Sequence, residues 1–347
     1  MTRFKSIVAI FFTSASLVAC GGGAGSGARQ QIRVVGSSTV YPFSTAVAEA
    51  FTKGSGGFKS PIVESTGTGA GMKLFCEGVG IQFPDIENAS RRIKKSEYED
   101  CVKNGVKDIV EVQVGLDGIA FAEATGGPGL TLTPLDLYKA LAETPFGKPN
   151  TAKSWKDVNP ALPDLPITVY GPPKTSGTRD ALAELILEKG CDADPAMKAL
   201  KESDKDKHKK ICTSVRTDGV YVEQGENDNL IVQKIESNPN VIGIFGFSFL
   251  EENMDKLKGI AMSGVVPTYA TISDFSYPGA RPLYIYIKAA HLKSIRGLRE
   301  FASEFASAWG PDGYLKKKGM VIAPDAVRAK SAEIVKAMSL LDPTTLK

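Results

Sequence analysis

Short apolar runs alternate with segments of helical periodicity along most of the chain. The runs are rich in Val and Ile and are bounded by turn residues, which is typical of buried strands. We expect strands at residues 32–35, 62–63, 109–114, 118–121, 167–170, 241–245 and 283–287. Because helical segments separate these runs, the pattern predicts an α/β fold with parallel strands.

Three of the helical segments carry a clear apolar stripe, in which apolar residues recur three or four positions apart. The stripes consist of Phe43, Val47, Ala50 and Phe51, of Leu182, Leu185 and Ile186, and of Ile295, Leu298, Phe301, Phe305 and Trp309. Such stripes usually pack in the core, so we expect them to be structural.

The first twenty residues have the pattern of an export signal. Arg3 and Lys5 form a basic start, an apolar stretch too short to span a bilayer follows, and small residues lead to Cys20. Small residues that end on a cysteine, here LVAC, resemble a bacterial lipoprotein signal, which is cut before Cys20 and carries lipid on that thiol. A plain secretory signal is the alternative. In both cases we expect residues 1–19 to be a signal peptide and residues 20–31 to be a flexible tether.

The rest of the 347-residue chain is longer than one compact core usually holds, so two domains are expected. We place lobe I at residues 32–116 and 246–347, and lobe II at residues 117–245. A chain that leaves one lobe, builds another and returns joins the two by more than one crossover. Such lobes can close on a ligand about a hinge.

The charge balance argues against a nucleic-acid partner. The chain has 42 Lys and Arg against 39 Asp and Glu, whereas a nucleic-acid-binding protein shows a marked basic excess. No apolar run after the signal reaches membrane length, so membrane attachment would depend on Cys20 alone.

Four cysteines follow the signal, namely Cys76, Cys101, Cys191 and Cys212. An even count in an exported chain predicts disulfides, and pairing of sequence neighbours would give each lobe one bridge worth roughly 3 kcal/mol. A zinc site is the alternative. It is disfavoured because the chain has no CxxC spacing and only two histidines, His208 and His291.

Four segments rich in Ser, Thr and Gly or Arg are the most informative part of the sequence. We refer to them as the first loop (GSSTV, residues 36–40), the second loop (STGTG, 65–69), the third loop (SRR, 90–92) and the fourth loop (SGTR, 176–179). The first, second and fourth follow apolar runs, and each of the four is expected to open a helix.

The shared chemistry of these loops favours an anion. The first N–H groups of a helix lack intrahelical partners and carry partial positive charge, and Ser and Thr hydroxyls add further donors. In an α/β fold the loops at the carboxyl ends of strands meet at one edge, where ligands bind. Ser and Thr are also ordinary helix caps, so each loop alone is weak evidence. Four together predict a pocket for a tetrahedral oxyanion.

The usual phosphate motifs of intracellular enzymes do not fit these loops. A P-loop needs Gly-Lys-Ser/Thr, whereas Gly71 is followed by Met72 and Lys73. A dinucleotide fingerprint needs GxGxxG, and Met72 stands where its third glycine would be. There is no GxSxG, and neither histidine lies near a candidate serine. We therefore expect binding without catalysis.

The loops and their surroundings resemble the phosphate-binding protein of the bacterial phosphate ABC transporter, the PstS family. The matching segments occur in family order: GSSTVYPF, STGTGAGMKLFC, NASRRIK, GLDGIAF, LTPLDLYKAL, SWKDV, TSGTRDALAEL and NPNVIGIFGFSFLEEN. The resemblance implies a two-lobed type II periplasmic-binding-protein fold, with two crossovers and a central cleft. It implies a monomeric periplasmic protein, without enzyme activity, cofactor or metal, that hands inorganic phosphate to membrane permease subunits.

Carried over by position, the resemblance implies a set of phosphate contacts, to which we add two arginines as the cationic partners. The contacts are Ser38, Thr39, Val40, Thr68, Ser90, Ser176, Gly177 and Thr178, and the arginines are Arg91 and Arg179.

The sequence departs from the family at two positions. An aspartate that follows the third-loop serine and accepts the proton of the phosphate is replaced by Arg91, and an arginine four residues before the fourth-loop serine is replaced by Pro172. Our hypothesis is that Arg91 supplies the cation, with Arg179 as helper, and that Arg92 is surface charge.

The loss of the aspartate leaves selectivity for phosphate over sulfate open. Asp117 or Asp218 could take over the proton, although both lie in glycine-flanked turns where aspartate is common. The alternatives are a binding protein for another oxyanion such as sulfate, an exported phosphohydrolase that uses the same pocket, and a lipoprotein that kept the fold and lost the ligand.

Overall fold

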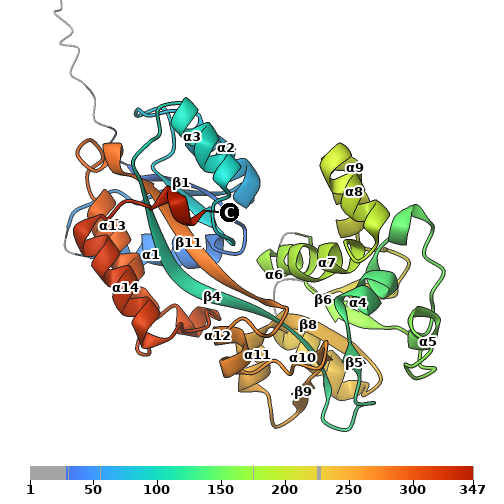
Figure 1. The fold of residues 1–347 in the computed structure, drawn as a ribbon. Coiled ribbons are helices and arrows are strands. Elements are labelled where there is room, and N and C mark those ends of the chain that lie inside the picture. The colour runs from blue at the N-terminus through green and yellow to red at the C-terminus, as the bar shows by residue number, and fades with distance from the viewer. Residues whose placement is uncertain (1–28, 30, 55, 175, 225–227, 347) are drawn as a thin grey trace, which may run out of the picture.

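The computed structural model describes residues 29, 31–54, 56–174, 176–224 and 228–346. The predicted signal peptide, the lipidation site Cys20 and nearly all of the predicted tether therefore lie outside the described residues. Within the described ranges, no helix is both long and apolar enough to cross a membrane. Figure 1 shows the chain folded into two lobes, with β4 (Ile109–Ala124) and β11 (Ala280–Lys288) running between them.

Lobe I contains three parallel strands that form one end of the sheet. β1 (Arg33–Gly36) pairs with β2 (Ile62–Ser65) and with β3 (Ile86–Ala89), and β11 lies antiparallel between β3 and β4. The accompanying helices are α1 (Tyr41–Lys53), α2 (Thr68–Cys76), α3 (Lys95–Lys103), α13 (Leu298–Ala308) and α14 (Asp325–Ala337), with the short turns η3 (Ala289–His291), η4 (Lys316–Lys318) and η5 (Pro343–Thr345).

Lobe II is built on the other half of β4. β8 (Ile242–Gly246) is antiparallel to β4 and parallel to β6 (Val169–Gly171), which pairs with β7 (Tyr221–Glu223). The remaining strands are β5 (Thr131–Leu132), β9 (Leu257–Gly259) and β10 (Ala261–Met262). The remaining helices are α4 (Pro134–Leu141), η1 (Pro145–Gly147), α5 (Trp155–Val158), α6 (Gly177–Ala181), η2 (Leu182–Leu187), α7 (Glu188–Cys191), α8 (Pro195–Ser203), α9 (Lys205–Thr213), α10 (Asp228–Ser237), α11 (Phe247–Glu252) and α12 (Tyr269–Ser273).

The two strands predicted at 109–114 and 118–121 are one strand, β4. The intervening glycines do not end it, because β11 pairs with it from Ile109 through Gly118. At Gly115, a Cβ atom would lie 2.6 Å from the sulfur of Met320, so the small residue permits close packing against the strand. The expectation of parallel strands holds within each lobe, whereas β4 and β11 are antiparallel to their neighbours. The long strand β4 and its partner β11 therefore connect the lobes.

The lobe boundaries given above stay a prediction. β9 and β10 follow residue 246, yet β9 pairs with β4 on the edge opposite β8, and β10 pairs with β5. These pairings favour a return of the chain to lobe I after residue 262.

The predicted apolar stripes lie largely in the core. Val47, Ile186, Leu298, Phe301 and Phe305 are all fully buried. Both disulfides pair sequence neighbours as predicted. Cys76–Cys101 joins the ends of α2 and α3, and Cys191–Cys212 joins α7 to α9. The bridges therefore fix the helices that flank the loops, one in each lobe.

Candidate functional site

The four loops border two adjoining cavities, of about 950 Å³ and about 600 Å³. The larger one is lined by Ser90, Arg91 and Arg92 of the third loop and by Arg179 of the fourth, and the smaller one by Ser38 of the first loop and by the whole second loop. The other predicted contacts line neither cavity: Thr39, Val40, Ser176, Gly177 and Thr178. The residues that line both are Thr68, Gly69, Lys174, Asp180, Glu184 and Lys209. Residues of both lobes thus enclose one cleft.

The parallel pairing of β1, β2 and β3 brings the first three loops to the same sheet edge. Gly36 at the end of β1 is level with Ser65 of β2 and with Asn88 of β3. Gly36 has φ +127°, and a Cβ atom there would lie 2.2 Å from the carbonyl oxygen of Asn88, so only glycine fits. The close approach of the loops therefore depends on the residue that opens the first of them.

The third loop does not open a helix, and in this respect the sequence prediction is wrong. β3 ends at Ala89 and α3 begins only at Lys95, so Ser90, Arg91 and Arg92 lie in the connecting loop. The short run before Ser90 contains Glu and Asn, which hid a fully buried strand from the apolar pattern. Ser90 reaches the cleft because it follows β3 at the edge of the sheet, and not because a helix begins there.

The second and third loops contact each other through their hydroxyls. The Thr68 Oγ1 and Ser90 Oγ atoms are 3.0 Å apart, and the Ser90 N–H donates to Thr68 Oγ1 at 3.1 Å. Both residues are buried and both line the larger cavity. Because hydroxyl groups can rotate, this pair can turn donors toward an anion.

The first and fourth loops contact each other across the lobes. Ser38 donates to the carboxylate of Asp180, and Thr39 Oγ1 donates to the Gly177 carbonyl at 3.1 Å. Gly177 packs so closely that a Cβ atom would lie 2.4 Å from Thr39 Cα. Val40 contributes only backbone, because its side chain is fully buried in the core.

The fourth loop begins a helix, as predicted. Ser176 caps α6 by accepting the Thr178 N–H at 3.2 Å, and its side chain is buried. A helix with this start presents N–H groups toward the first loop.

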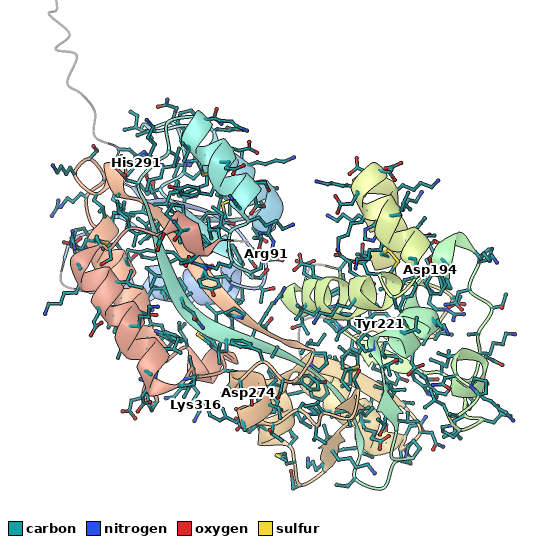
Figure 2. All side chains as sticks on the ribbon, viewed as in Figure 1. Arg91, Asp194, Tyr221, Asp274, His291 and Lys316 are labelled. Carbon is teal, nitrogen blue, oxygen red and sulfur yellow. A yellow bond between two sulfur atoms is a disulfide. The ribbon has the colours of Figure 1, made fainter. Side chains whose placement is uncertain are left out.

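Arg91 and Arg92 point to different partners. Arg91 makes a two-pronged contact with Glu97, at 2.9 Å and 2.7 Å, whereas Arg92 contacts Glu111 and the backbone of Thr345. Burial acts to lower the pKa of Arg91, but the hydrogen bonds and charge of Glu97 outweigh it and leave the pKa raised. Arg91 is therefore charged, and Figure 2 shows it on the side of lobe I that faces lobe II.

Arg179 is buried with its guanidinium turned toward β6 and β7. It donates to the Pro172 carbonyl at 3.3 Å, lies 3.5 Å from a Glu223 oxygen, and stands 4.3 Å from the centre of the Tyr221 ring. It still borders the larger cavity. The two predicted arginines thus border the same cavity, although each is held by different partners.

Arg281 is a residue of the site that the sequence analysis missed. It lies on β11, is 3% exposed, and donates to Asp117 at 3.0 Å, Glu184 at 2.8 Å and Thr39 at 2.6 Å. The available signal was a lone arginine at the start of a strand of alternating apolar residues. The three contacts tie β4, the helix after the fourth loop and the first loop to one guanidinium.

The carboxylates proposed to accept the proton have cationic partners. Asp117 is paired with Arg281, and Asp218 is paired with Arg216 at 2.8 Å and 2.5 Å. Asp218 does not line either cavity. Asp180, which the sequence analysis did not single out as a proton acceptor, lines both.

Glu87 is a fully buried carboxyl directly beneath the first loop. Its oxygens and the side-chain amide of the neighbouring Asn88 have no hydrogen-bond partner among the described residues. Burial raises the pKa of Glu87 well above its ordinary value, and the charge of Arg91 offsets part of this effect. A buried carboxyl of this kind favours its neutral form.

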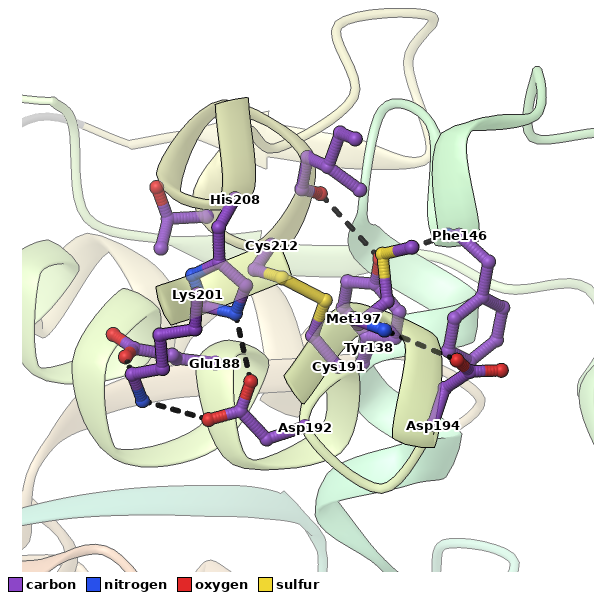
Figure 3. Close-up of a disulfide and its surroundings, with 12 residues drawn as sticks. Tyr138, Phe146, Glu188, Cys191, Asp192, Asp194, Met197, Lys201, His208 and Cys212 are labelled. Atoms are coloured by element: carbon purple, nitrogen blue, oxygen red, sulfur yellow. Dashed lines mark hydrogen bonds and ion pairs between the residues drawn. A yellow bond between two sulfur atoms is a disulfide. The ribbon is translucent and has the colours of Figure 1, made fainter. Parts of the chain in front are cut away.

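His208 lies beside the second disulfide, and together they have the residue types of a metal site. Figure 3 shows His208 next to Cys191 and Cys212, and the possible ligand atoms of the three lie within 4.8 Å of one another. The two sulfur atoms are bonded to each other, however, and zinc binds thiolate. His208 instead contacts Asp192 at 2.7 Å, which fits a structural role between α7 and α9.

The arrangement of two α/β lobes around a cleft defines a binding protein of the periplasmic type. The model of the PBP superfamily domain matches residues 22–308. A PstS phosphate-binding protein of Staphylococcus saprophyticus is 35% identical over 82% of this chain and 79% of the relative, and the SphX protein of Synechococcus elongatus is 34% identical over 79% and 73%. The chain therefore belongs to the PstS family within the PBP superfamily.

The solved structures agree with this assignment. A possible phosphate-binding protein from Planctomyces limnophilus has a TM-score of 0.71 and 29% identity, and covers 88% of this chain and 98% of its own. A phosphate transport receptor from Vibrio cholerae, at 19% identity and a TM-score of 0.58, shares the fold.

Proposed function

We propose that the protein captures inorganic phosphate in the cleft between its lobes and delivers it to the permease of an ABC transporter. The observation that carries the proposal is that residues of all four loops line one cleft, namely Ser38, the second loop, Ser90 with Arg91, and Arg179. The names of its relatives, PstS and phosphate-binding protein, support phosphate as the anion.

The proposed contacts divide between the two lobes. Lobe I offers the first, second and third loops, and lobe II offers the fourth. The proposed ligand residues are Ser38, Thr39, Val40, Thr68, Ser90, Arg91, Ser176, Gly177, Thr178 and Arg179. Because the groups come from both sides, bound phosphate would favour the closed arrangement of the lobes.

Capture requires no chemical step, so we infer that the protein is not an enzyme. We further infer that it acts in the periplasm as a monomer, held to the membrane by lipid on Cys20, which lies outside the described residues. Mass spectrometry of the protein from membranes tests the anchor, because lipidation adds the mass of the acyl chains to a chain that begins at Cys20.

Calorimetry with purified protein tests the function. We expect one phosphate per chain and weaker binding of sulfate, and a phosphatase assay with and without divalent metal should show no turnover. If phosphate and sulfate bound with equal affinity, the protein would be a binding protein for oxyanions in general and not for phosphate. Turnover that needs an intact cleft would overturn binding without catalysis.

A further inference from the structure

We propose that Lys174 and Lys209 form a cationic clamp on lobe II that closes onto the anion held by the second loop. This inference rests on the proposed function, because it assigns two further contacts to the same bound anion. Neither lysine belongs to the loop residues named above.

Most cationic side chains of the cleft form ion pairs with carboxylates, whereas Lys174 and Lys209 do not among the described residues. The arginines and one lysine are engaged: Arg91 with Glu97, Arg92 with Glu111, Arg179 with Glu223, Arg281 with Asp117 and Glu184, and Lys201 with Glu188 and Asp192. Within the described ranges, the ammonium groups of Lys94, Lys174, Lys205 and Lys209 have no hydrogen bond or ion pair.

Two of these four lysines also face the second loop. Lys174 and Lys209 line the smaller cavity together with residues 65–70, whereas Lys94 and Lys205 line only the larger one. Lys174 comes from the segment before the fourth loop, and Lys209 from α9. Figure 1 shows α9 across the cleft from α2, the helix that the second loop opens.

The chemistry of the opposite wall suits a cationic partner. The second loop offers N–H groups and hydroxyls but no cation, since it reads STGTG. Asp180 and Glu184 line the cavity together with the two lysines. Glu184 forms an ion pair with Arg281, however, and Asp180 accepts a hydrogen bond from the hydroxyl of Ser38. An anion that enters would therefore meet the unengaged ammonium groups first.

A lysine suits this role because of its length and flexibility. Its ammonium is a compact charge on a four-carbon stem, so it can follow an anion as the lobes approach. A contact from Lys174 or Lys209 to an anion on the second loop would span the cleft. Such a contact exists only when the lobes are closed, and it therefore stabilises that state.

The test compares charge-removing variants at the two lysines with a control on α9, the helix of Lys209. Lys174→Gln and Lys209→Gln should each raise the Kd for phosphate at least fivefold, and the double variant at least thirtyfold. Lys210→Gln is the matched control, because this exposed lysine is next in sequence but lines neither cavity. It should change the Kd by less than twofold. Calorimetry at fixed ionic strength gives the Kd, and thermal melts confirm that each variant is folded.

The outcomes separate this inference from the proposed function. If the wild-type protein fails to bind phosphate, the proposed function is wrong. If the wild type binds and the Lys174 and Lys209 variants bind equally well, the clamp alone is overturned. Lys→Arg variants at the two positions should recover most of the affinity, and equal losses in the Lys210 control would point to net charge instead.

Discussion

The choice of Arg91 as the cation of the third loop can be tested at a single residue. Its guanidinium is paired with Glu97 but also borders the larger cavity, so an anion in the cleft can share its charge. We expect Arg91→Ala to weaken phosphate binding by more than tenfold, as measured by calorimetry. Arg92→Ala is the control, because this neighbouring arginine also borders the larger cavity and is also paired, with Glu111 and Thr345, but is surface charge in our hypothesis; its removal should cost less than twofold. A loss of phosphate affinity below twofold for Arg91→Ala would contradict the assignment of Arg91 as the cation of the site.

Glu87 allows a prediction about stability and pH. Its pKa is raised in the folded protein, so above its ordinary value of about 4.5 the folded state binds more protons than the unfolded state. The contribution of Glu87 to stability is therefore full at low pH and is lost as the pH rises toward the raised value. Glu87→Gln keeps the shape and removes the charge.

We expect Glu87→Gln to increase the free energy of unfolding by about 1 kcal/mol or more at pH 8, because the amide does not ionise in the unfolded chain and so does not share the cost of burying a carboxyl with a raised pKa. At pH 4 the variant and the wild type should be equally stable. Denaturant titrations without phosphate at both pH values provide the measurement. Glu99→Gln, on an exposed residue of α3, should show no such difference, and a pH-independent effect at Glu87 would contradict the raised pKa.

At the scale of the elements, the sequence pattern located strands and loops well where the residues were apolar or glycine-rich. β3 was missed because Glu87 and Asn88 interrupt its apolar run, although every residue in it is buried. β4 was divided because a single sequence does not reveal that β11 would pair across its glycines. The engaged state of the arginines depends on Glu97, Glu223 and other distant partners, which spacing alone cannot identify.

The contact of the first and fourth loops predicts the effect of one added methyl group. A Cβ atom at Gly177 would lie 2.4 Å from Cα and 2.7 Å from N of Thr39, and backbone atoms cannot turn aside as a flexible side chain can. Gly177→Ala should therefore separate the loops and raise the Kd for phosphate at least tenfold, with a stability loss of roughly 1–3 kcal/mol.

Gly126→Ala provides the control for that experiment. A Cβ atom at Gly126 would meet no atom within 4 Å, and its φ is not in the left-handed region. We expect unchanged affinity and stability in this variant. If Gly177→Ala also bound phosphate as the wild type does, the two loops would not need their close contact for binding.

On the scale of the whole molecule, β4 and β11 connect the lobes. Arg281 of β11 lies opposite Asp117 of β4 in this pair of strands. Its guanidinium joins Thr39 on one side of the cleft to Glu184 on the other, and Asp117 holds it from β4. We therefore expect Arg281 to affect the relative position of the lobes as well as the free energy of unfolding. A buried arginine that served only one lobe would affect stability alone.

Arg281→Met and Arg216→Met separate these two effects. Arg216 is equally buried, but its partners Asp218, Ala140 and Ala152 all lie in lobe II. Each variant should lose roughly 1–3 kcal/mol of unfolding free energy, because each leaves a buried hydrogen-bond acceptor without its donor, Thr39 Oγ1 in one and the Ala140 carbonyl in the other. Only Arg281→Met should change the small-angle X-ray scattering of the phosphate-free protein, since only Arg281 bridges the lobes. Identical scattering from all three proteins would show that β4 and β11 alone set the resting angle of the cleft.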